Sequence, residues 1–367
     1  MKNKVSMQQI ADAVGLSKYA VSKALAGKDG VSAKTREKII EAATQLGYFK
    51  QKHAATGKSG KPKNHFRGWM PEDNGANKRT VAVLMPSVRL QTMDSAFWSV
   101  IVNGIGHVLS HYGLGMLIIT EQTVDHFEMV LKPDRLLGVI GVGEISTTML
   151  LEIQRLNLPF VLTDHEDSLV PSDSVFASNI DSVALITGHL LGLGHRSFWF
   201  LGDTQFSRSF TDRWIGFRKA LEEYAIMIDP VRDKLPLSGT DREANRRVLQ
   251  EKLDSLTAKG TALPTAWVCA NDEIALSALS LLKERGIDVP AEICITGFDN
   301  IDESQRAEVP LTTVHVKKEQ LGERAVSALL DRIRDPQRPF EKINIACDLV
   351  VRASSGGRDN KGNSWRI

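Results

Sequence analysis

The sequence is short of cysteine and of long apolar runs, and each shortage excludes a class of protein. Its 367 residues include three cysteines, Cys269, Cys294 and Cys347, which lie far apart inside apolar stretches. This spacing is typical of buried reduced thiols and provides neither a disulfide framework nor a metal site. No apolar run approaches the ~20 residues that cross a bilayer, and the N-terminus has no signal-peptide pattern. We expect a cytoplasmic protein with no membrane partner, no metal and no other cofactor.

The sequence also lacks the short motifs of common catalytic sites. It has no glycine-rich phosphate loop, no G-x-S-x-G elbow and no H-E-x-x-H run. The segment GVIGVGE lacks the G-x-G-x-x-G spacing of a dinucleotide loop. We therefore expect a protein that is not an enzyme. A sugar-processing hydrolase or kinase with a similar α/β fold is the enzymatic alternative, and it ranks behind the two binding functions named at the end of this subsection.

Positive charge is scarce outside the N-terminal part of the chain. The net charge of the whole chain is +2, but residues 1–79 hold 16 Lys/Arg and 6 Asp/Glu, a net charge of +10. The remaining 288 residues hold 30 Lys/Arg and 38 Asp/Glu, a net charge of −8. A basic segment without an amphipathic apolar stripe favours a polyanion such as DNA over a membrane surface. A basic disordered tail is the alternative.

Three short helices are predicted within the first fifty residues. Ser6 can cap a first helix, in which apolar residues recur at helical spacing, and Gly15 ends that helix. Ser17 can cap a second helix, and Ser32 opens a third. Two helices joined by a tight glycine-containing turn, the second with polar side chains pointing outward, predict a helix-turn-helix that lies in a major groove.

The same segment resembles the DNA-binding head of the lactose-repressor/galactose-repressor family, through the runs VSMQQIADAVGLSKYAVSKAL and VSAKTREKIIEAATQLGY. The resemblance implies that bases are read by Lys18, Tyr19 and Lys23. It implies phosphate contacts for Ser6, Ser17, Ser22 and Ser32. The alternative is that all of these are solvated side chains and helix caps. Many family members carry arginine at the position of Lys23, and lysine lacks the planar fork that discriminates guanine well.

Residues 51–79 are rich in Lys, Gly, Asn and Pro and lack helical periodicity, which predicts a basic flexible linker. In the resembled family a short hinge helix follows the head and inserts a leucine into the minor groove. That leucine position falls here on Gly57. Three alternatives stay open: the hinge helix is absent, a displaced apolar anchor comes from Phe66, Trp69 or Met70, or the linker is disordered without DNA.

From Thr80 onward, short apolar runs alternate with helical segments such as 97–112 and 212–225. Alternation of β and α predicts a parallel sheet with helices on both faces, and about ten strands fit two doubly wound lobes better than one sheet. The predicted fold is α + α/β. A helix-turn-helix domain spans residues 1–50, the linker spans 51–79, a two-lobed ligand-sensing domain spans 80–357, and a tail spans 358–367.

Polar side chains follow several predicted strands, which is where ligands bind in doubly wound folds. Asp164, Asn271 and Asp299 lie at strand ends, and Arg213 lies at a helix start. Carboxylates and an arginine can bind the paired hydroxyls of a sugar. Surface or capping roles are the alternatives for these side chains. Two aromatic residues near the start of the first α/β helix could stack on a sugar ring, Phe97 and Trp98.

The motifs AND, GFDN and R-x-x-G-F resemble the effector site of the same family, whose sensing domain is similar to periplasmic sugar-binding proteins. The resemblance implies that hydroxyls are bound by Arg213, Asn271 and Asp299. It implies that Asp164, Phe97 and Trp98 form part of the wall of the site. Asp272 is expected to cap the helix DEIALSALSLLKERG, and LTTVHVKKEQLG resembles the last crossover between the lobes.

These observations predict a homodimeric transcriptional regulator, a repressor, that binds double-stranded operator DNA. Its operator affinity would be controlled by a small-molecule effector, a sugar or a sugar derivative, held between two lobes. The alternative is a sugar-binding carrier protein with no gene-regulatory role. The helix-turn-helix and the missing signal peptide favour the regulator.

Overall fold

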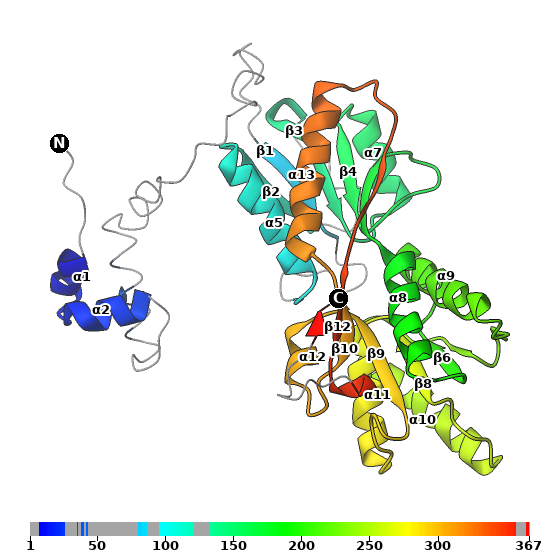
Figure 1. Ribbon diagram of the computed structural model, residues 1–367. Coiled ribbons are helices and arrows are strands. Elements are labelled where there is room, and N and C mark those ends of the chain that lie inside the picture. Colours follow the sequence, from blue (N-terminus) through cyan, green and yellow to red (C-terminus); the bar gives the residue numbers. More distant parts are fainter. Residues whose placement is uncertain are drawn as a thin grey trace. The chain divides into compact units, whose positions relative to one another are not determined.

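The computed structural model describes residues 7–25, 35, 38–39, 42, 80–86, 95–120, 133–356 and 365–366. The chain divides into two compact units, Met1–Glu72 and Asp73–Ile367, and each is described by itself (Figure 1). The whole predicted linker, 51–79, lies outside the described residues, including Gly57 and the three candidate apolar anchors. Ser6 and Ser32 lie outside them too. The predicted domain boundaries and the hinge-helix alternatives therefore stay predictions.

The first unit contains two short helices, α1 (Met7–Val14) and α2 (Lys18–Leu25). Gly15 ends α1 in the left-handed region at φ 69°, which glycine adopts without strain. The Ser17 hydroxyl accepts a hydrogen bond from the Ala20 amide at 3.2 Å, as expected for the cap of α2. A small core closes between the helices and a third helical stretch, and its fully buried side chains are Ile10, Ala11, Val21 and Ile39.

The second unit contains two sheets, and their strands confirm the prediction of two α/β lobes. The first sheet has the order β11-β5-β4-β3-β1-β2, and every described pairing in it is parallel. Its strands are β1 (Thr80–Leu84), β2 (Gly115–Ile119), β3 (Leu136–Val142), β4 (Phe160–Thr163), β5 (Asp173–Ala177) and β11 (Lys342–Ile345). The lobe built on this sheet is called lobe A.

The second sheet has the order β13-β12-β10-β9-β8-β6-β7, and β12 pairs antiparallel with both of its neighbours. The lobe built on it is called lobe B. Its strands are β6 (Phe198–Leu201), β7 (Lys234–Leu235), β8 (Ala266–Cys269), β9 (Cys294–Asp299), β10 (Thr312–His315), β12 (Asp348–Val351) and β13 (Trp365–Arg366). The parallel strands end at one edge of the sheet, so the segments that follow them lie close together.

Helices cover both sheets, as the alternating pattern predicts (Figure 1). Lobe A carries α5 (Trp98–His111), α7 (Thr147–Arg155), α13 (Lys318–Arg334) and the 3-10 turn η2 (Pro133–Arg135). Lobe B carries α8 (Asn179–Gly192), α9 (Arg208–Glu223), α10 (Arg242–Ala258), α11 (Asp272–Glu284), α12 (Asp302–Arg306) and η3 (Ala353–Ser355). In Figure 1, α5 and α13 lie side by side in lobe A, and α8 and α9 lie side by side in lobe B.

The described chain passes between the lobes at three places. It leaves β5 for α8 at Ser178, leaves β10 for α13 at Val316 and Lys317, and leaves β11 for β12 at Ala346 and Cys347. The run at 311–322, expected to be the last crossover, is therefore the second of the three. The expectation was wrong because α13 is followed by β11, which pairs with β5 in lobe A before the chain returns to lobe B.

Glycine allows α5 and α13 to pack closely in lobe A. A Cβ atom at Gly104 of α5 would overlap the backbone carbonyl of Glu319, and a Cβ atom at Gly322 of α13 would overlap the carbonyl of Ile101. Both obstacles are backbone atoms, which cannot rotate away as a flexible side chain can. The spacing of these two helices therefore depends on the two glycines.

We predict that Gly322→Ala lowers the free energy of unfolding of the sensing unit by about 1–3 kcal/mol, because the added methyl group forces α13 away from α5. Gly188→Ala in α8 is the matched control, since a Cβ there meets no atom within 4 Å. The control should be stabilising by about 0.5–1 kcal/mol, since alanine replaces glycine inside a helix. Urea unfolding of both variants measures the difference, and equal effects would contradict the close-packing account.

Candidate functional site: the cleft between the lobes

A cleft of about 1050 Å³ opens at the carboxyl ends of the parallel strands, between lobes A and B. It is lined by segments that follow β4, β6, β8 and β9 and by the residues at the start of α5. All six side chains predicted to bind ligand line it: Phe97, Trp98, Asp164, Arg213, Asn271 and Asp299. The structure thus brings together residues up to two hundred positions apart, and their roles in binding stay predictions.

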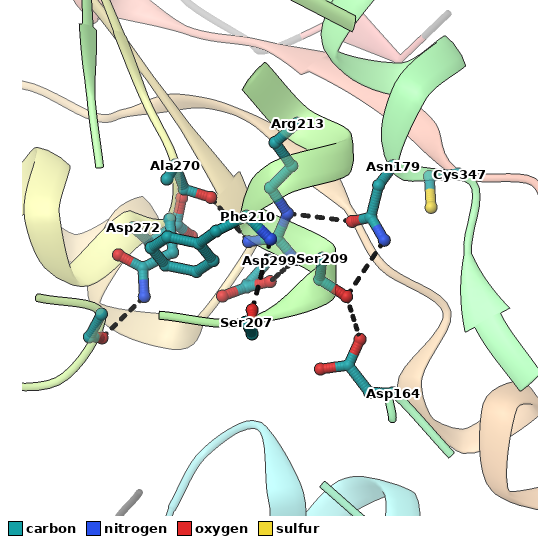
Figure 2. Close-up of polar contacts among 12 residues, drawn as sticks. Asp164, Asn179, Ser207, Ser209, Phe210, Arg213, Ala270, Asp272, Asp299 and Cys347 are labelled. Carbon is teal, nitrogen blue, oxygen red and sulfur yellow. Dashed lines mark hydrogen bonds and ion pairs between the residues drawn. The ribbon is translucent and has the colours of Figure 1, made fainter. Parts of the chain in front are cut away.

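Arg213 lies at the floor of the cleft and is 3% exposed. It lies in the second turn of α9, because the helix begins at Arg208 and not at the predicted position 212. Its Nε donates to Asn179 Oδ1 at 2.9 Å, and its Nη1 donates to the carbonyl of Ala270 at 2.6 Å (Figure 2). The guanidinium also lies 3.7 Å from the centroid of the Phe298 ring. These contacts hold the guanidinium in one orientation.

Asp299 ends β9 with φ 109°, outside the range that most L-residues adopt, and is 9% exposed. Its Oδ1 lies 3.6 Å from Arg213 Nη2, and this oxygen has no hydrogen-bond donor among the described residues. Burial raises the pKa of the Asp299 carboxyl to about 7, and the charge of Arg213 opposes that rise. The Asp299 carbonyl accepts a hydrogen bond from Lys318, the first residue of α13. The side chain therefore presents an unfilled acceptor at the cleft.

Asn271, and not Asp272, caps α11. Asn271 Oδ1 accepts from the Ile274 amide at 3.0 Å, and its Nδ2 donates to the carbonyl of Gly239 at 2.7 Å. The expectation that Asp272 is the cap was wrong, because the extended residue before the helix is Asn271, at φ −149° and ψ 175°. Both groups of the Asn271 amide already have protein partners, which explains this side chain without a ligand.

Asp272 is fully buried and organises the loop after β9. It accepts hydrogen bonds from the Ile301 amide at 3.0 Å, the Ser304 hydroxyl at 2.5 Å and the Thr313 hydroxyl at 2.6 Å. Burial raises the pKa of its carboxyl, and these hydrogen bonds oppose the rise. Asp272 therefore supports the strand end that presents Asp299 and does not itself reach for a ligand.

Side chains of the two lobes also interact directly across the cleft. Asp164, at the end of β4 in lobe A, accepts a hydrogen bond from the Ser209 hydroxyl of α9 at 2.5 Å (Figure 2). Glu166 of lobe A forms an ion pair with Arg208 of α9 at 2.5 Å, and it also pairs with Lys342 of β11. Sequence reasoning missed Ser209, Arg208 and Glu166. Their positions beside Asp164 and Arg213 in the sequence were the available signal.

The cleft holds an aromatic pair from each lobe. Phe97 and Trp98 of lobe A meet edge to face, with ring centroids 4.8 Å apart. Phe206 and Phe210 of lobe B lie 4.7 Å apart between ring centroids, and both line the cleft. The second pair was not predicted, although it lies within the eight residues before Arg213. Aromatic faces in a polar cleft can cover the apolar face of a ring.

The helix-turn-helix residues within the described chain lie on the surface of α2 or just before it. Ser17, Lys18 and Ser22 are exposed, and the Tyr19 side chain is 75% exposed. Lys23 Nζ lies 6.0 Å from the centroid of the Tyr19 ring. The capping hydrogen bond accounts for Ser17 without DNA. The predicted base and phosphate contacts of all these residues stay predictions.

Among the helices described, none combines the length and the apolar character that a membrane span requires. The described part of the chain also has no group of three or more His, Cys, Asp or Glu side chains placed to hold a metal ion.

Two sequence profiles match the chain. The profile described as "Bacterial regulatory proteins, lacI family" matches residues 6–51, and the profile described as "Periplasmic binding protein-like domain" matches residues 187–355. Among curated relatives, the HTH-type transcriptional repressor PurR of Actinobacillus pleuropneumoniae serotype 3 is 32% identical over 244 residues. That match covers 64% of this chain and 68% of the relative.

Solved structures of transcriptional regulators have the same fold. A complex of the regulator CelR with cellobiose matches with a TM-score of 0.67 and 23% identity, over 95% of this chain and 99% of that one. A lac repressor dimer bound to operator and to the anti-inducer ONPF matches with a TM-score of 0.61 and 24% identity, over 96% of this chain and 99% of that one. Together with the head domain and the cleft, the profiles and the PurR relative show that this chain belongs to the lactose-repressor/galactose-repressor family of bacterial transcriptional regulators.

Proposed function

We propose that the chain is a transcriptional repressor whose affinity for operator DNA is set by a sugar or sugar derivative bound between lobes A and B. Family membership makes it a DNA-binding transcriptional regulator. One observation carries the rest of the proposal. The chain that contains the helix-turn-helix also contains a cleft where the buried Arg213 and the unfilled acceptor of Asp299 face the same space.

A polyhydroxylated ligand fits the chemistry of this cleft. Asp299 can accept a hydrogen bond from a hydroxyl, and the aromatic pairs can cover the apolar face of a sugar ring. The CelR complex contains cellobiose in a chain of the same fold, which supports a sugar as the effector. We propose binding without turnover, so the cleft acts as a sensor and not as an enzyme. A carrier protein is disfavoured, because sugar carriage does not require a DNA-binding helix-turn-helix.

The proposed protein acts in the cytoplasm as a homodimer that places two recognition helices in successive half-sites of the operator. The lac repressor structure supports this arrangement, because it is a dimer bound to operator. The outer strand β2 of lobe A adds support, since Met116, Leu117 and Ile118 expose 36–39% of their surface. Apolar side chains exposed on an outer strand are typical of a surface that another chain covers.

The switch in this proposal is a change in the arrangement of the two lobes. The contacts Asp164–Ser209 and Glu166–Arg208 belong to one arrangement, and an effector that bridges the lobes would favour the arrangement it fits best. Only a difference in affinity for two arrangements can transmit binding from the cleft to the head. Coupling free energies of about 1–3 kcal/mol are typical of such systems.

We predict that Asp299→Asn weakens effector binding by about tenfold to a hundredfold, because it replaces one of the two carboxyl oxygens with an amide NH2 group, which only donates. Operator affinity without effector should stay unchanged. Arg218→Gln is the matched control, because Arg218 lies on the same helix, α9, but is not among the residues that line the cleft and pairs with Glu222 at the surface. Titration of operator-bound protein with the effector measures the response, and a normal response in Asp299→Asn would contradict the assignment.

The recognition helix gives a second prediction. Lys18→Ala and Tyr19→Ala should change which operator bases are preferred, since each lost base contact removes about 1–3 kcal/mol of discrimination. Asp12→Asn is the control, because Asp12 is exposed on α1 and its charge acts on all sequences alike. Selection from randomised DNA with the full chain measures the preference. Uniform weakening across all sequences would show that Lys18 and Tyr19 contact phosphates instead.

A further inference from the structure

We propose that the effector is a polyhydroxylated ring without any anionic group, and that the cleft selects against sugar phosphates and sugar acids. This inference rests on the proposed function, because it concerns the ligand of the same cleft. It is narrower than that function, since a regulator of this kind could respond to a phosphorylated sugar equally well.

The charge of the cleft wall is the first observation. Among the described residues that line the cleft, nine have carboxyl side chains, three are arginines (Arg208, Arg213 and Arg242) and none is a lysine. Burial raises the pKa of two of these carboxyls, Asp272 and Asp299, so the other seven carry most of the negative charge. A cleft with walls of low dielectric concentrates this negative field where a ligand would lie. An anionic group entering the cleft therefore meets repulsion that a neutral hydroxyl does not.

The second observation is that Arg208 and Arg242 are each paired with two carboxylates. Arg208 lies between Glu166 at 2.5 Å and Asp212 at 3.2 Å. At the mouth of the cleft, Arg242 pairs with Glu273 and also with Glu303, the latter at 2.8 Å. Two carboxylates thus neutralise each of these guanidinium groups. A phosphate could pair with one of them only by leaving carboxylates uncompensated.

The third arginine, Arg213, also interacts with protein groups. Two nitrogens of the Arg213 guanidinium donate hydrogen bonds to protein acceptors, Asn179 and the Ala270 carbonyl, and the third, Nη2, forms an ion pair with Asp299 at 3.6 Å. Arg213 is also stacked against Phe298 and is almost fully buried. Because only 3% of its surface is exposed, this arginine offers little access to a bound anion.

Asp299 favours a ligand whose hydroxyl group donates a hydrogen bond. The residue is more than nine-tenths buried, it lines the cleft, and its Oδ1 has no hydrogen-bond donor among the described residues. A buried acceptor without a donor is unfavourable until a ligand donates to it. A hydroxyl group can donate, whereas a fully ionised phosphate or carboxylate offers only acceptors.

The aromatic pairs indicate a ring and not an open-chain polyol. Phe97 and Trp98 from lobe A, and Phe206 and Phe210 from lobe B, place flat apolar surfaces in a wall that is otherwise polar. The C–H face of a pyranose or furanose ring can cover such surfaces while its hydroxyls reach the carboxylates.

The test is a calorimetric titration of the full chain with matched sets of ligands. Each set holds a neutral sugar, its phosphate and its acid, such as glucose, glucose 6-phosphate and glucuronate, or ribose and ribose 5-phosphate, with cellobiose as a neutral disaccharide. We expect binding by at least one neutral sugar and at least about hundredfold weaker binding by its anionic partners, since like-charge juxtaposition is strongly unfavourable. Equal or tighter binding of an anionic member contradicts the proposal. Failure of every neutral sugar to bind contradicts it as directly.

A double variant tests the cause of the selection. Glu273→Gln with Glu303→Gln leaves Arg242 unpaired at the cleft mouth and removes two negative charges. The gap in affinity between neutral sugar and phosphate should shrink by about tenfold. Both carboxylates are partly exposed, so their loss should leave the fold intact.

Glu284→Gln is the matched control. It leaves Arg246 unpaired on the same lobe but outside the cleft lining, so the affinity gap should not change. If the difference in affinity between neutral sugar and phosphate is unchanged in the double variant, or shrinks equally in the control, the role of arginine pairing is contradicted.

Selection of operator sequences by ligand-free protein distinguishes failure of this inference from failure of the proposed function. Loss of sequence-specific DNA binding would refute the regulator, and anion preference would refute only the ligand class.

Discussion

The burial of Arg213 is the constraint on which the site depends. A buried guanidinium needs partners for its donors and its charge. Here Nε and Nη1 donate to Asn179 at the start of α8 and to the Ala270 carbonyl after β8, and Nη2 forms an ion pair with Asp299 at the end of β9. Lys318, just after the second crossover, holds the carbonyl of Asp299. The residues that form the floor of the cleft are thus tied to two of the three segments that cross between the lobes. Any movement of the lobes must therefore act on the geometry of Asp299.

Much of this fold could be predicted from local patterns in the sequence. Alternating apolar runs and helical segments predicted two α/β lobes, and Gly15 with Ser17 predicted the turn between α1 and α2. Boundaries were less certain, since a shift of one residue decides whether Asn271 or Asp272 caps α11. The order of crossovers was missed because pairing of β11 with β5 joins residues that are far apart in the chain.

The candidate site, too, could be predicted only in part. Residues at strand ends, such as Asp164 and Asp299, could be predicted because parallel strands place their carboxyl ends together. The bonds between the lobes could not be predicted, because Asp164–Ser209 and Glu166–Arg208 join residues separated by more than forty positions. The hydrogen bond from the Asn271 amide to the Gly239 carbonyl could not be predicted either, because Gly239 lies in a loop without a recognisable motif. Local sequence patterns predict where a side chain lies along the chain, and the packed structure decides which partner it has.

The proposed switch requires the cleft and the operator-binding head to be thermodynamically coupled. The most direct measurement is the affinity of the full chain for a neutral sugar that binds the cleft, taken with and without bound operator, together with operator affinity with and without that sugar. Linkage requires both affinities to change by the same factor, which is typically about 5-fold to 150-fold. We expect the two factors to be equal and to differ from one. Sugar binding that is the same in free and operator-bound protein would contradict this expectation.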